Sequence, residues 1–341
     1  MKKIILLILA MSLLVVGCKK AEETADSKVN NTKETVQETN EGEKSSQEGK
    51  KIKVGIVQFA QHIALDRSRE GFIEGLKDMG YEVEEETVNV NGDITLIGTA
   101  VKKLEGSGVD LIYAIATPAA QEARNSVENI PVIFNAVTDP VSANLVESNE
   151  HPGRNVTGVS DYFSIETQLE NFLEIFPDCK KLGVLYSTGE ANSEVQVKEL
   201  EEVANKHGLE LVKAGVANVN DVSLAMSSLV TKIDCYVGIQ DNLASSATSI
   251  IAQRLKEAKI PSFAGESGPV ENGLLLSDGI DYVKLGRSAA EIADEIIKGK
   301  SPADIPVVFS TDTKRIVNKT TADALGLDEN SKVFEGAEEV N

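Results

Sequence analysis

The order of apolar and polar positions along the chain is repeated. A short apolar run, a loop and an amphipathic helix that ends before a glycine are followed by further alternating strand and helix patterns, and the whole series then recurs. Each copy predicts the order β-α-β-α-β-α-β. The corresponding segments are 53–57 and 181–185, about 65–79 and 193–207, 81–83 and 209–212, 110–116 and 234–239, and 130–134 and 260–263.

The duplicated pattern predicts an α/β fold. Short apolar strands that alternate with helices are typical of a parallel sheet covered on both faces, and their crossovers are right-handed. We therefore expect two doubly wound parallel-sheet lobes; two independent domains side by side are the alternative. Later segments at 155–159, 273–277 and 305–309 are expected to cross between the lobes as a multi-strand hinge, and a helix at 282–298 to return to the first lobe. The predicted boundaries are 52–157 plus about 280–305 for lobe one, 158–279 plus about 306–330 for lobe two, and 331–341 for a tail.

The N-terminal segment predicts export. Lys2 and Lys3 precede an apolar run at 4–16 that is too short to span a bilayer as a mature helix, so residues 1–17 are expected to be a signal peptide. Gly17 before Cys18 resembles the lipobox of bacterial lipoproteins. That resemblance implies cleavage before Cys18 and attachment of acyl chains such as palmitate to it. An ordinary secretory signal is the alternative.

The segment after Cys18 is polar. Residues 18–51 are mostly Lys, Glu, Ser, Thr, Asn, Gln and Gly, a composition that cannot bury enough apolar surface to offset the entropy lost on ordering. We expect a disordered tether with a root-mean-square reach of roughly 30 Å.

Charge, cysteine and histidine usage exclude several functions. The formal net charge of −20 argues against nucleic acid and against a polybasic membrane-binding surface. Cys179 and Cys235 are expected to pack as small hydrophobic residues instead of forming a disulfide. His62, His151 and His207 are scattered without metal-ligand spacing, so neither a metal nor a cofactor is expected.

Ligands of parallel α/β sheets bind beyond the carboxyl ends of the strands, and the duplication identifies the loops at those ends. Two lobes whose strand ends face each other would form a cleft that closes on a small ligand. The candidate binding residues are Gln58, His62, Leu65, Thr117, Pro118, Ala119, Gln121, Thr138 and Asp139 in lobe one, and Ser187, Glu190, Asn192, Ser193, Asp241, Asn242, Glu266 and Asp278 in lobe two.

Two of these loops predict how a zwitterion would lie. Thr117 as N-cap with Pro118 at the first helical position would leave backbone amides free for a carboxylate, although the pair can equally be a plain capping motif. Asp241 occupies the repeat position of Thr117, and it or Glu190 would bind the ammonium group. The alternative is that Asp241 caps its own helix.

The loop motifs resemble those of the ABC-transporter substrate-binding lipoproteins in the tryptophan/aromatic-amino-acid-associated group of type I periplasmic binding proteins. The resemblance covers about residues 52–327, and it implies a two-lobed clamshell that passes its ligand to a membrane permease driven by a cytoplasmic ATPase. Some members of the group bind aromatic amino acids. The motifs lie at 116–121, 136–140, 155–161, 189–193, 241–242 and 279–282.

These observations together predict an extracytoplasmic, lipid-anchored solute-binding protein of an ABC importer. The ligand would be an amino acid, with aromatic amino acids as one class, and the protein is expected to be a monomer. An extracellular ligand sensor that docks on a membrane receptor is the alternative. An enzyme is not expected, because the sequence contains no G-x-S-x-G elbow, P-loop, Rossmann glycine motif or metal cluster.

Overall fold

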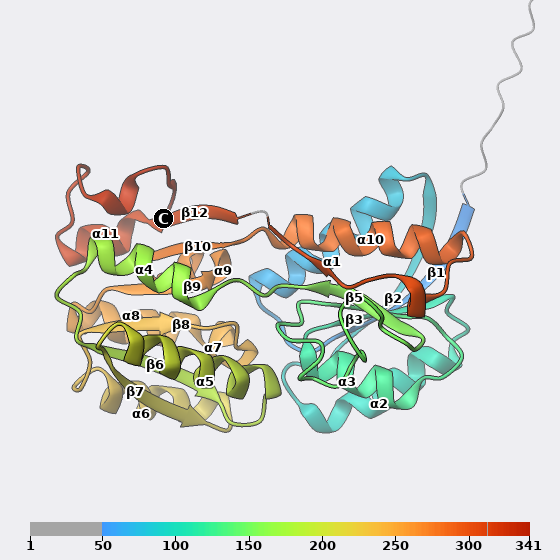
Figure 1. The fold of residues 1–341 in the computed structure, drawn as a ribbon, viewed down its shortest axis with the longest axis horizontal. Helices are drawn as coiled ribbons and strands as arrows, with labels where there is room; N and C mark the ends of the chain where they lie inside the picture. Colours follow the sequence, from blue (N-terminus) through green and yellow to red (C-terminus); the bar gives the residue numbers. More distant parts are fainter. Residues whose placement is uncertain (1–49, 312) are drawn as a thin grey trace, which may run out of the picture. The chain divides into compact units, whose positions relative to one another are not determined.

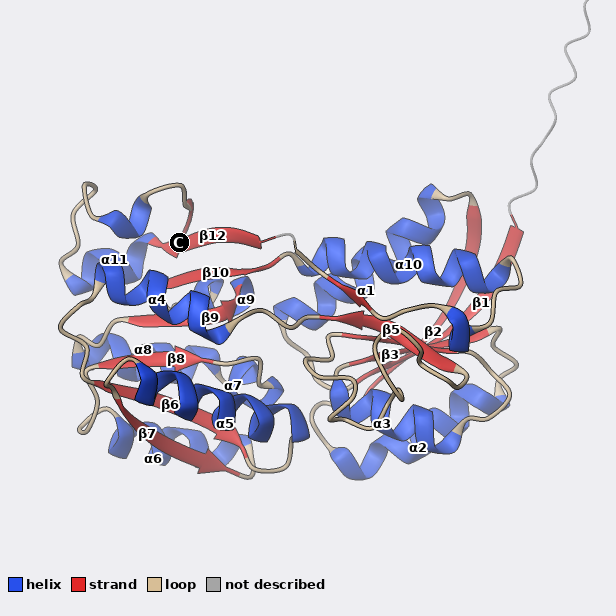
Figure 2. Cartoon of the chain, in the orientation of Figure 1, coloured by secondary structure: helices blue, strands red, loops and turns tan. Residues whose placement is uncertain are grey.

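The computed structural model describes residues 50–311 and 313–341, which form two β-sheets with flanking helices (Figure 1, Figure 2). The predicted signal peptide, Cys18 and most of the predicted tether lie outside the described residues. Lys50 and Lys51, which the sequence assigns to the tether, are the first residues of strand β1 (Lys50–Gln58). Among the described helices, none has the length and apolar composition needed to cross a membrane.

The first sheet has the strand order β11-β5-β4-β3-β1-β2, and every neighbouring pair is parallel. Its central strands are apolar and fully buried, as in the Leu111–Ile115 strand, because helices cover both faces. The strands are β1 (Lys50–Gln58), β2 (Tyr81–Asn89), β3 (Leu111–Ile115), β4 (Val132–Asn135), β5 (Val156–Ser160) and β11 (Val308–Phe309); the helices are α1 (Ile63–Asp78), α2 (Ile94–Gly106), α3 (Thr117–Ser126) and α10 (Tyr282–Ile297), with a 3₁₀ turn at Pro302–Asp304.

The second sheet has the order β13-β12-β10-β9-β8-β6-β7, in which only the β10–β12 pair is antiparallel. Separate apolar clusters form the cores of this lobe. The strands are β6 (Lys181–Ser187), β7 (Glu210–Val216), β8 (Cys235–Gly238), β9 (Ser262–Glu266), β10 (Leu276–Ile280), β12 (Thr313–Asn318) and β13 (Glu338–Val340); the helices are α4 (Ile165–Ile175), α5 (Ala191–Lys206), α6 (Val219–Leu229), α7 (Asn242–Ser246), α8 (Thr248–Ala258), α9 (Ser267–Glu271) and α11 (Lys319–Leu325), with a 3₁₀ turn at Lys332–Phe334.

The predicted α/β fold with two parallel-sheet lobes is confirmed. The runs β5-β4-β3-β1-β2 and β10-β9-β8-β6-β7 have the same order, as the internal duplication requires. Two details differ from the sequence-based boundaries. Strand β11 pairs with β5, so the last crossing between lobes lies after Phe309 instead of near 306, and Glu338–Val340 of the predicted tail pairs with β12.

Helices α1 and α10 pack with their backbones in close contact, which joins the start of the first lobe to the helix that returns from the second (Figure 1). A Cβ added at Gly71 would lie 2.1 Å from the Val283 carbonyl oxygen, and one at Gly286 would lie 2.1 Å from the Ser68 carbonyl oxygen. Only glycine permits this approach. The contact fixes the position of Tyr282, the first residue of α10.

A disulfide joins Cys179 and Cys235, so the prediction that these cysteines pack as free thiols was wrong. Cys179 lies in the turn before β6, and Cys235 begins β8, which is the neighbour of β6 in the sheet. Their Cα atoms are 5.9 Å apart, a usual separation for a disulfide, although their sequence separation is 56. The sheet order that brings them together is not a local feature of the sequence.

Candidate functional site

A small cavity lies where loops at the carboxyl ends of strands from both sheets meet. Its volume is about 10 Å³, which is near the minimum for one water molecule (roughly 10–15 Å³). Both lobes contribute to its wall, and seven of the candidates proposed from sequence line it. The lining residues are His62, Leu65, Ala136, Thr138, Asp161, Asn192, Gln240, Asp241, Asn242, Ser245, Glu266 and Tyr282.

Asp241 has hydrogen-bond donors from its own lobe on both carboxylate oxygens. It accepts from the backbone N–H of Ala244 at 2.7 Å, from that of Ser187 at 2.6 Å and from the Ser193 hydroxyl at 2.7 Å. Burial raises the pKa of Asp241. The residue is therefore the N-cap of α7, as the alternative interpretation of the sequence held.

Glu190 is also engaged within lobe two. Its oxygens accept from the backbone N–H groups of Asn242 at 3.2 Å and Leu243 at 3.1 Å, and from the Asn242 side-chain amide at 2.5 Å. Burial, and then the charge of nearby Asp241, raise the pKa of Glu190 to about 7. Each of the two carboxylates that the sequence pointed to for the ammonium group therefore already accepts three hydrogen bonds within lobe two.

Two other buried carboxylates are only half partnered. Asp161 accepts a 2.6 Å hydrogen bond from the Tyr282 hydroxyl on Oδ2, and Glu266 accepts one of 2.6 Å from the Ser245 hydroxyl on Oε1. Their other oxygens, Asp161 Oδ1 and Glu266 Oε2, are buried without a hydrogen-bond partner among the described residues, as is Asn192 Oδ1. Such acceptors in a cavity are costly unless a ligand supplies donors.

Burial shifts the ionisation of both acids toward neutral pH. It raises the pKa of Asp161 to about 6, with a further increase from the charge of Glu266, while the Tyr282 hydrogen bond and the nearby Thr138 hydroxyl oppose the shift. Burial likewise raises the pKa of Glu266 to about 7. Asp161 and Tyr282 were not among the site residues proposed from sequence, although both lie in loop motifs that carry the family resemblance. An acid placed directly after a buried apolar strand was the available signal for Asp161.

Direct contacts connect the lobes around this cavity. His62 Nε2 lies 3.2 Å from Asn242 Oδ1, and because the amide oxygen can only accept, the ring donates. Burial lowers the pKa of His62 and keeps the ring neutral at pH 7. On the hinge side, the Arg67 guanidinium makes a bidentate pair with Glu271, at 2.5 and 2.8 Å. These contacts define a closed arrangement of the two lobes.

The start of helix α3 differs from its sequence-based description. Its N-cap is Ala116, which has a φ of 81°, so Thr117 is the first helical residue and not the cap. The turn from β3 into α3 thus places the N-cap one position earlier than the Thr-Pro pattern suggests. Thr117, Pro118 and Ala119 are buried and are not among the residues lining the cavity.

The remaining candidates have partners elsewhere. The Gln58 side-chain amide donates to Asp66, that of Gln121 donates to the Ala143 carbonyl, and Asp139 accepts from the Ser142 amide. The Asp278 carboxylate forms a bidentate pair with Arg315 of β12, at 2.6 and 2.7 Å. The structure thus places Asp278 in the pairing of β10 with β12, away from the cavity.

A second, larger pocket of about 240 Å³ adjoins the first and shares Asn242 with it. Loops at the ends of β1 and β2 form one side, and those at the ends of β6 and β7 form the other. Ser187 and Glu190, two candidates from the sequence, contribute to its wall. The pocket lies between lobes at repeat-equivalent loops, which begin α2 and α6.

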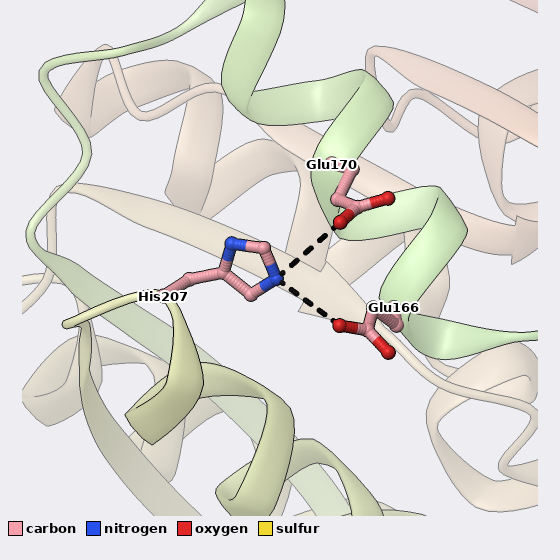
Figure 3. A group of neighbouring side chains, drawn as sticks. All are labelled: Glu166, Glu170 and His207. Carbon is pink, nitrogen blue, oxygen red and sulfur yellow. Dashed lines mark ion pairs between the residues drawn. The ribbon is translucent and has the colours of Figure 1, made fainter.

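His207 and two glutamates form a separate group on lobe two (Figure 3). His207 Nε2 lies 3.5 Å from Glu166 and 3.8 Å from Glu170, one turn apart on α4. The Lys206 ammonium also pairs with Glu166. Because the Lys206 ammonium already pairs with Glu166, we interpret the group as a cluster of ion pairs that joins the end of α5 to α4.

Comparisons with known proteins agree on one family. The family model described as ABC transporter substrate binding protein matches residues 53–341. The chain is 42% identical over 298 residues to a protein of Clostridioides difficile named "Tyrosine-binding protein", with 84% of this chain and 86% of the relative covered.

Two solved structures resemble this one to different degrees. An ABC domain from Streptococcus pneumonia in complex with L-Trp is 34% identical, with a TM-score of 0.81 and coverage of 85% of this chain and 100% of that one. The ligand-free, open structure of a substrate binding protein with adhesive properties from Clostridium difficile is 41% identical but has a TM-score of only 0.66, over 85% and 99%. The described conformation is therefore more similar to that of the L-Trp complex than to the open structure, although the open protein has the higher sequence identity.

Proposed function

Because the chain belongs to the ABC transporter substrate-binding protein family, which is a family of solute-binding proteins and not of enzymes, we propose that it binds an aromatic amino acid between its lobes and delivers it to the permease of an ABC importer. The observation that carries the ligand class is the buried cavity between lobes, whose unpartnered oxygens suit the ammonium group of an amino acid. The tyrosine-binding name of one relative and the L-Trp complex of another support an aromatic side chain.

Ligand entry requires the lobes to separate. An aromatic amino acid is far larger than a cavity of about 10 Å³. Opening would break the His62–Asn242 hydrogen bond and the Arg67–Glu271 ion pair, whereas α1 and α10 would stay packed within lobe one. Closing on the ligand would restore these contacts and remove the ligand from water, which is the hinge motion expected of a two-lobed binding protein.

Binding without turnover tests the proposal. The chain from Lys19 onward, which keeps every described residue, should be unfolded and refolded to remove any copurified ligand and then titrated by calorimetry. We expect saturable binding of L-tyrosine, L-tryptophan or L-phenylalanine, with L-alanine and L-aspartate much weaker. Mass spectrometry should recover the bound amino acid unchanged. Failure of all three aromatic amino acids to bind, or their conversion, would contradict the proposal.

We propose further that acyl chains on Cys18 anchor the mature protein to the cell membrane, with the polar segment after it as a spacer. A Cys18→Ser variant of the full-length chain is expected to lose the acyl chains, because serine lacks the thiol that carries them, and to leave the detergent phase on phase separation. Lys19→Gln, the adjacent control, should remain in the detergent phase. Detergent partitioning that is the same for Cys18→Ser and the unaltered chain would show that the anchor lies elsewhere.

A further inference from the structure

We propose that Asp161, Glu266 and Asn192 form the subsite for the α-ammonium group of the ligand, and that the arriving ammonium favours the ionised form of the two acids. The inference rests on the proposed function, since it assigns one end of the amino acid within the same cavity. It differs from the orientation that the sequence suggested, in which Asp241 or Glu190 binds the ammonium group.

The number of unpartnered acceptors matches the donor set of an ammonium group. A primary ammonium has three N–H donors and no acceptor, and the cavity presents three buried acceptor oxygens: Asp161 Oδ1, Glu266 Oε2 and Asn192 Oδ1. The three residues are between 2% and 6% exposed. Asp161 and Glu266 each have a hydroxyl on the other oxygen, from Tyr282 and Ser245, which fixes the direction of the carboxylate.

Asp241 and Glu190 fit this role less well. Each already accepts three hydrogen bonds from groups of its own lobe, and three of these six bonds come from backbone N–H groups at the start of α7. The bonds from Asn242, Leu243 and Ala244 order the start of the helix. An ammonium group would add little to a carboxylate that is already satisfied.

An ammonium group in this subsite should change the ionisation of the two acids. Burial raises the pKa of Asp161 to about 6, with a smaller contribution from the charge of Glu266, and it raises the pKa of Glu266 to about 7, so both acids are partly protonated near pH 6.5. An ammonium group between them favours the charged form of both. Binding near pH 6.5 should therefore release protons to the solvent.

The other ionisable groups around the pair do not supply this cation. On α1, Arg67 lowers the pKa of Glu266 by its charge, but its nitrogens are bonded to Glu271 and Ser267 of α9; His62 is neutral, and Asp66 accepts from Gln58. On α10, Tyr282 has a raised pKa and stays protonated. Asp241 and Glu190 of lobe two are acids with raised pKa values and supply no cation either.

The test compares single amide substitutions in the chain from Lys19 onward, by calorimetry with L-tyrosine and L-tryptophan. Asp161→Asn and Glu266→Gln should each weaken binding at least tenfold, whereas Glu194→Gln, at an exposed acid two residues from Asn192, should not change it. Tyramine, which keeps the amine, should show the same sensitivity. 3-(4-Hydroxyphenyl)propionate, which lacks the amine, should bind weakly and equally to all four proteins.

Proton release separates ammonium binding from a merely structural role. Titrations of the unaltered protein at pH 6.5 in buffers of different ionisation enthalpy should show proton release, and Glu266→Gln should reduce it. Affinity of the unaltered protein for L-tyrosine should fall at least tenfold from pH 8 to pH 5, with a shallower fall in each variant. The ligand-free variants should melt no lower than the unaltered protein at pH 8, because each loses a buried charge.

The outcomes distinguish this inference from the proposed function. If the unaltered protein binds aromatic amino acids and both amide variants bind them equally well, the ammonium subsite is overturned and the proposed function stands. Lower melting points of both variants at pH 8 with unchanged proton release would also overturn it, since the acids would then be structural. If the unaltered protein binds no aromatic amino acid, the proposed function fails and the inference fails with it.

Discussion

Replacing Gly286 with alanine is expected to destabilise the protein by about 3 kcal/mol, the upper part of the usual range for overpacking. The added methyl group would lie 2.1 Å from the Ser68 carbonyl oxygen and 2.7 Å from the Phe72 nitrogen, both backbone atoms of α1 that no side-chain rotation can move. Helix α10 would have to shift away from α1. The midpoint of denaturant unfolding measures the loss.

The same substitution should weaken ligand binding, because α10 begins at Tyr282, which holds the Asp161 carboxylate. Gly106→Ala is the matched control: this residue ends α2, and a Cβ there would meet nothing within 4 Å. It should leave affinity unchanged and stability equal or slightly higher, since alanine favours the helix. An unaltered unfolding midpoint for Gly286→Ala would contradict the close packing of α1 and α10.

The fold could be predicted because its evidence is local and occurs twice. Strands such as Leu111–Ile115 are buried along their whole length, so their residues form a continuous apolar run that is visible in the sequence. The second copy, Cys235–Gly238, repeats this pattern at the same place in the order of elements. Once two copies share one order of elements, the rules for parallel crossovers leave few topologies. The equal strand orders of the two sheets follow from this.

The site was only partly predictable, because its decisive contacts join residues distant in sequence. The position of each strand end identified the loops that carry His62, Asn242 and Glu266. The strand positions could not show that the Tyr282 hydroxyl donates to Asp161, which is 121 positions away in sequence. Nor could they show that Asp241 accepts hydrogen bonds from the backbone N–H groups of Ser187 and Ala244. Sequence identifies which carboxylates are near a cleft, whereas their free lone pairs depend on the packed structure.

The end of the chain gave the weakest signal. Glu338–Val340 is a polar three-residue strand that pairs at the sheet edge with β12, and the ion pairs of Lys314 with Glu338 and of Lys319 with Glu339 accompany the pairing. No apolar periodicity marks such an edge strand, because it buries little surface. Its pairing depends on the neighbouring strand.

Removing the disulfide is expected to lower the free energy of unfolding by about 4 kcal/mol, as Cys179→Ala/Cys235→Ala or by reduction of the unaltered protein. The bond closes a loop with a sequence separation of 56, and most of its stabilisation comes from restricting the unfolded chain. That loop contains β6, α5, β7 and α6, including Asn192 of the cavity, so the loss of stability is expected in lobe two. Urea unfolding with and without reductant measures it.

The double alanine variant is also the control, since reductant should not change its unfolding midpoint. Ligand affinity under native conditions should differ little between the oxidised and reduced forms, because Asn192 lies in the first turn of α5 and its side-chain amide donates a 2.9 Å hydrogen bond to the Gln240 carbonyl. This separates the disulfide, which acts on the unfolded chain, from Gly286, which acts on the folded site. An unfolding midpoint of the unaltered protein that does not respond to reductant would show that the disulfide contributes nothing.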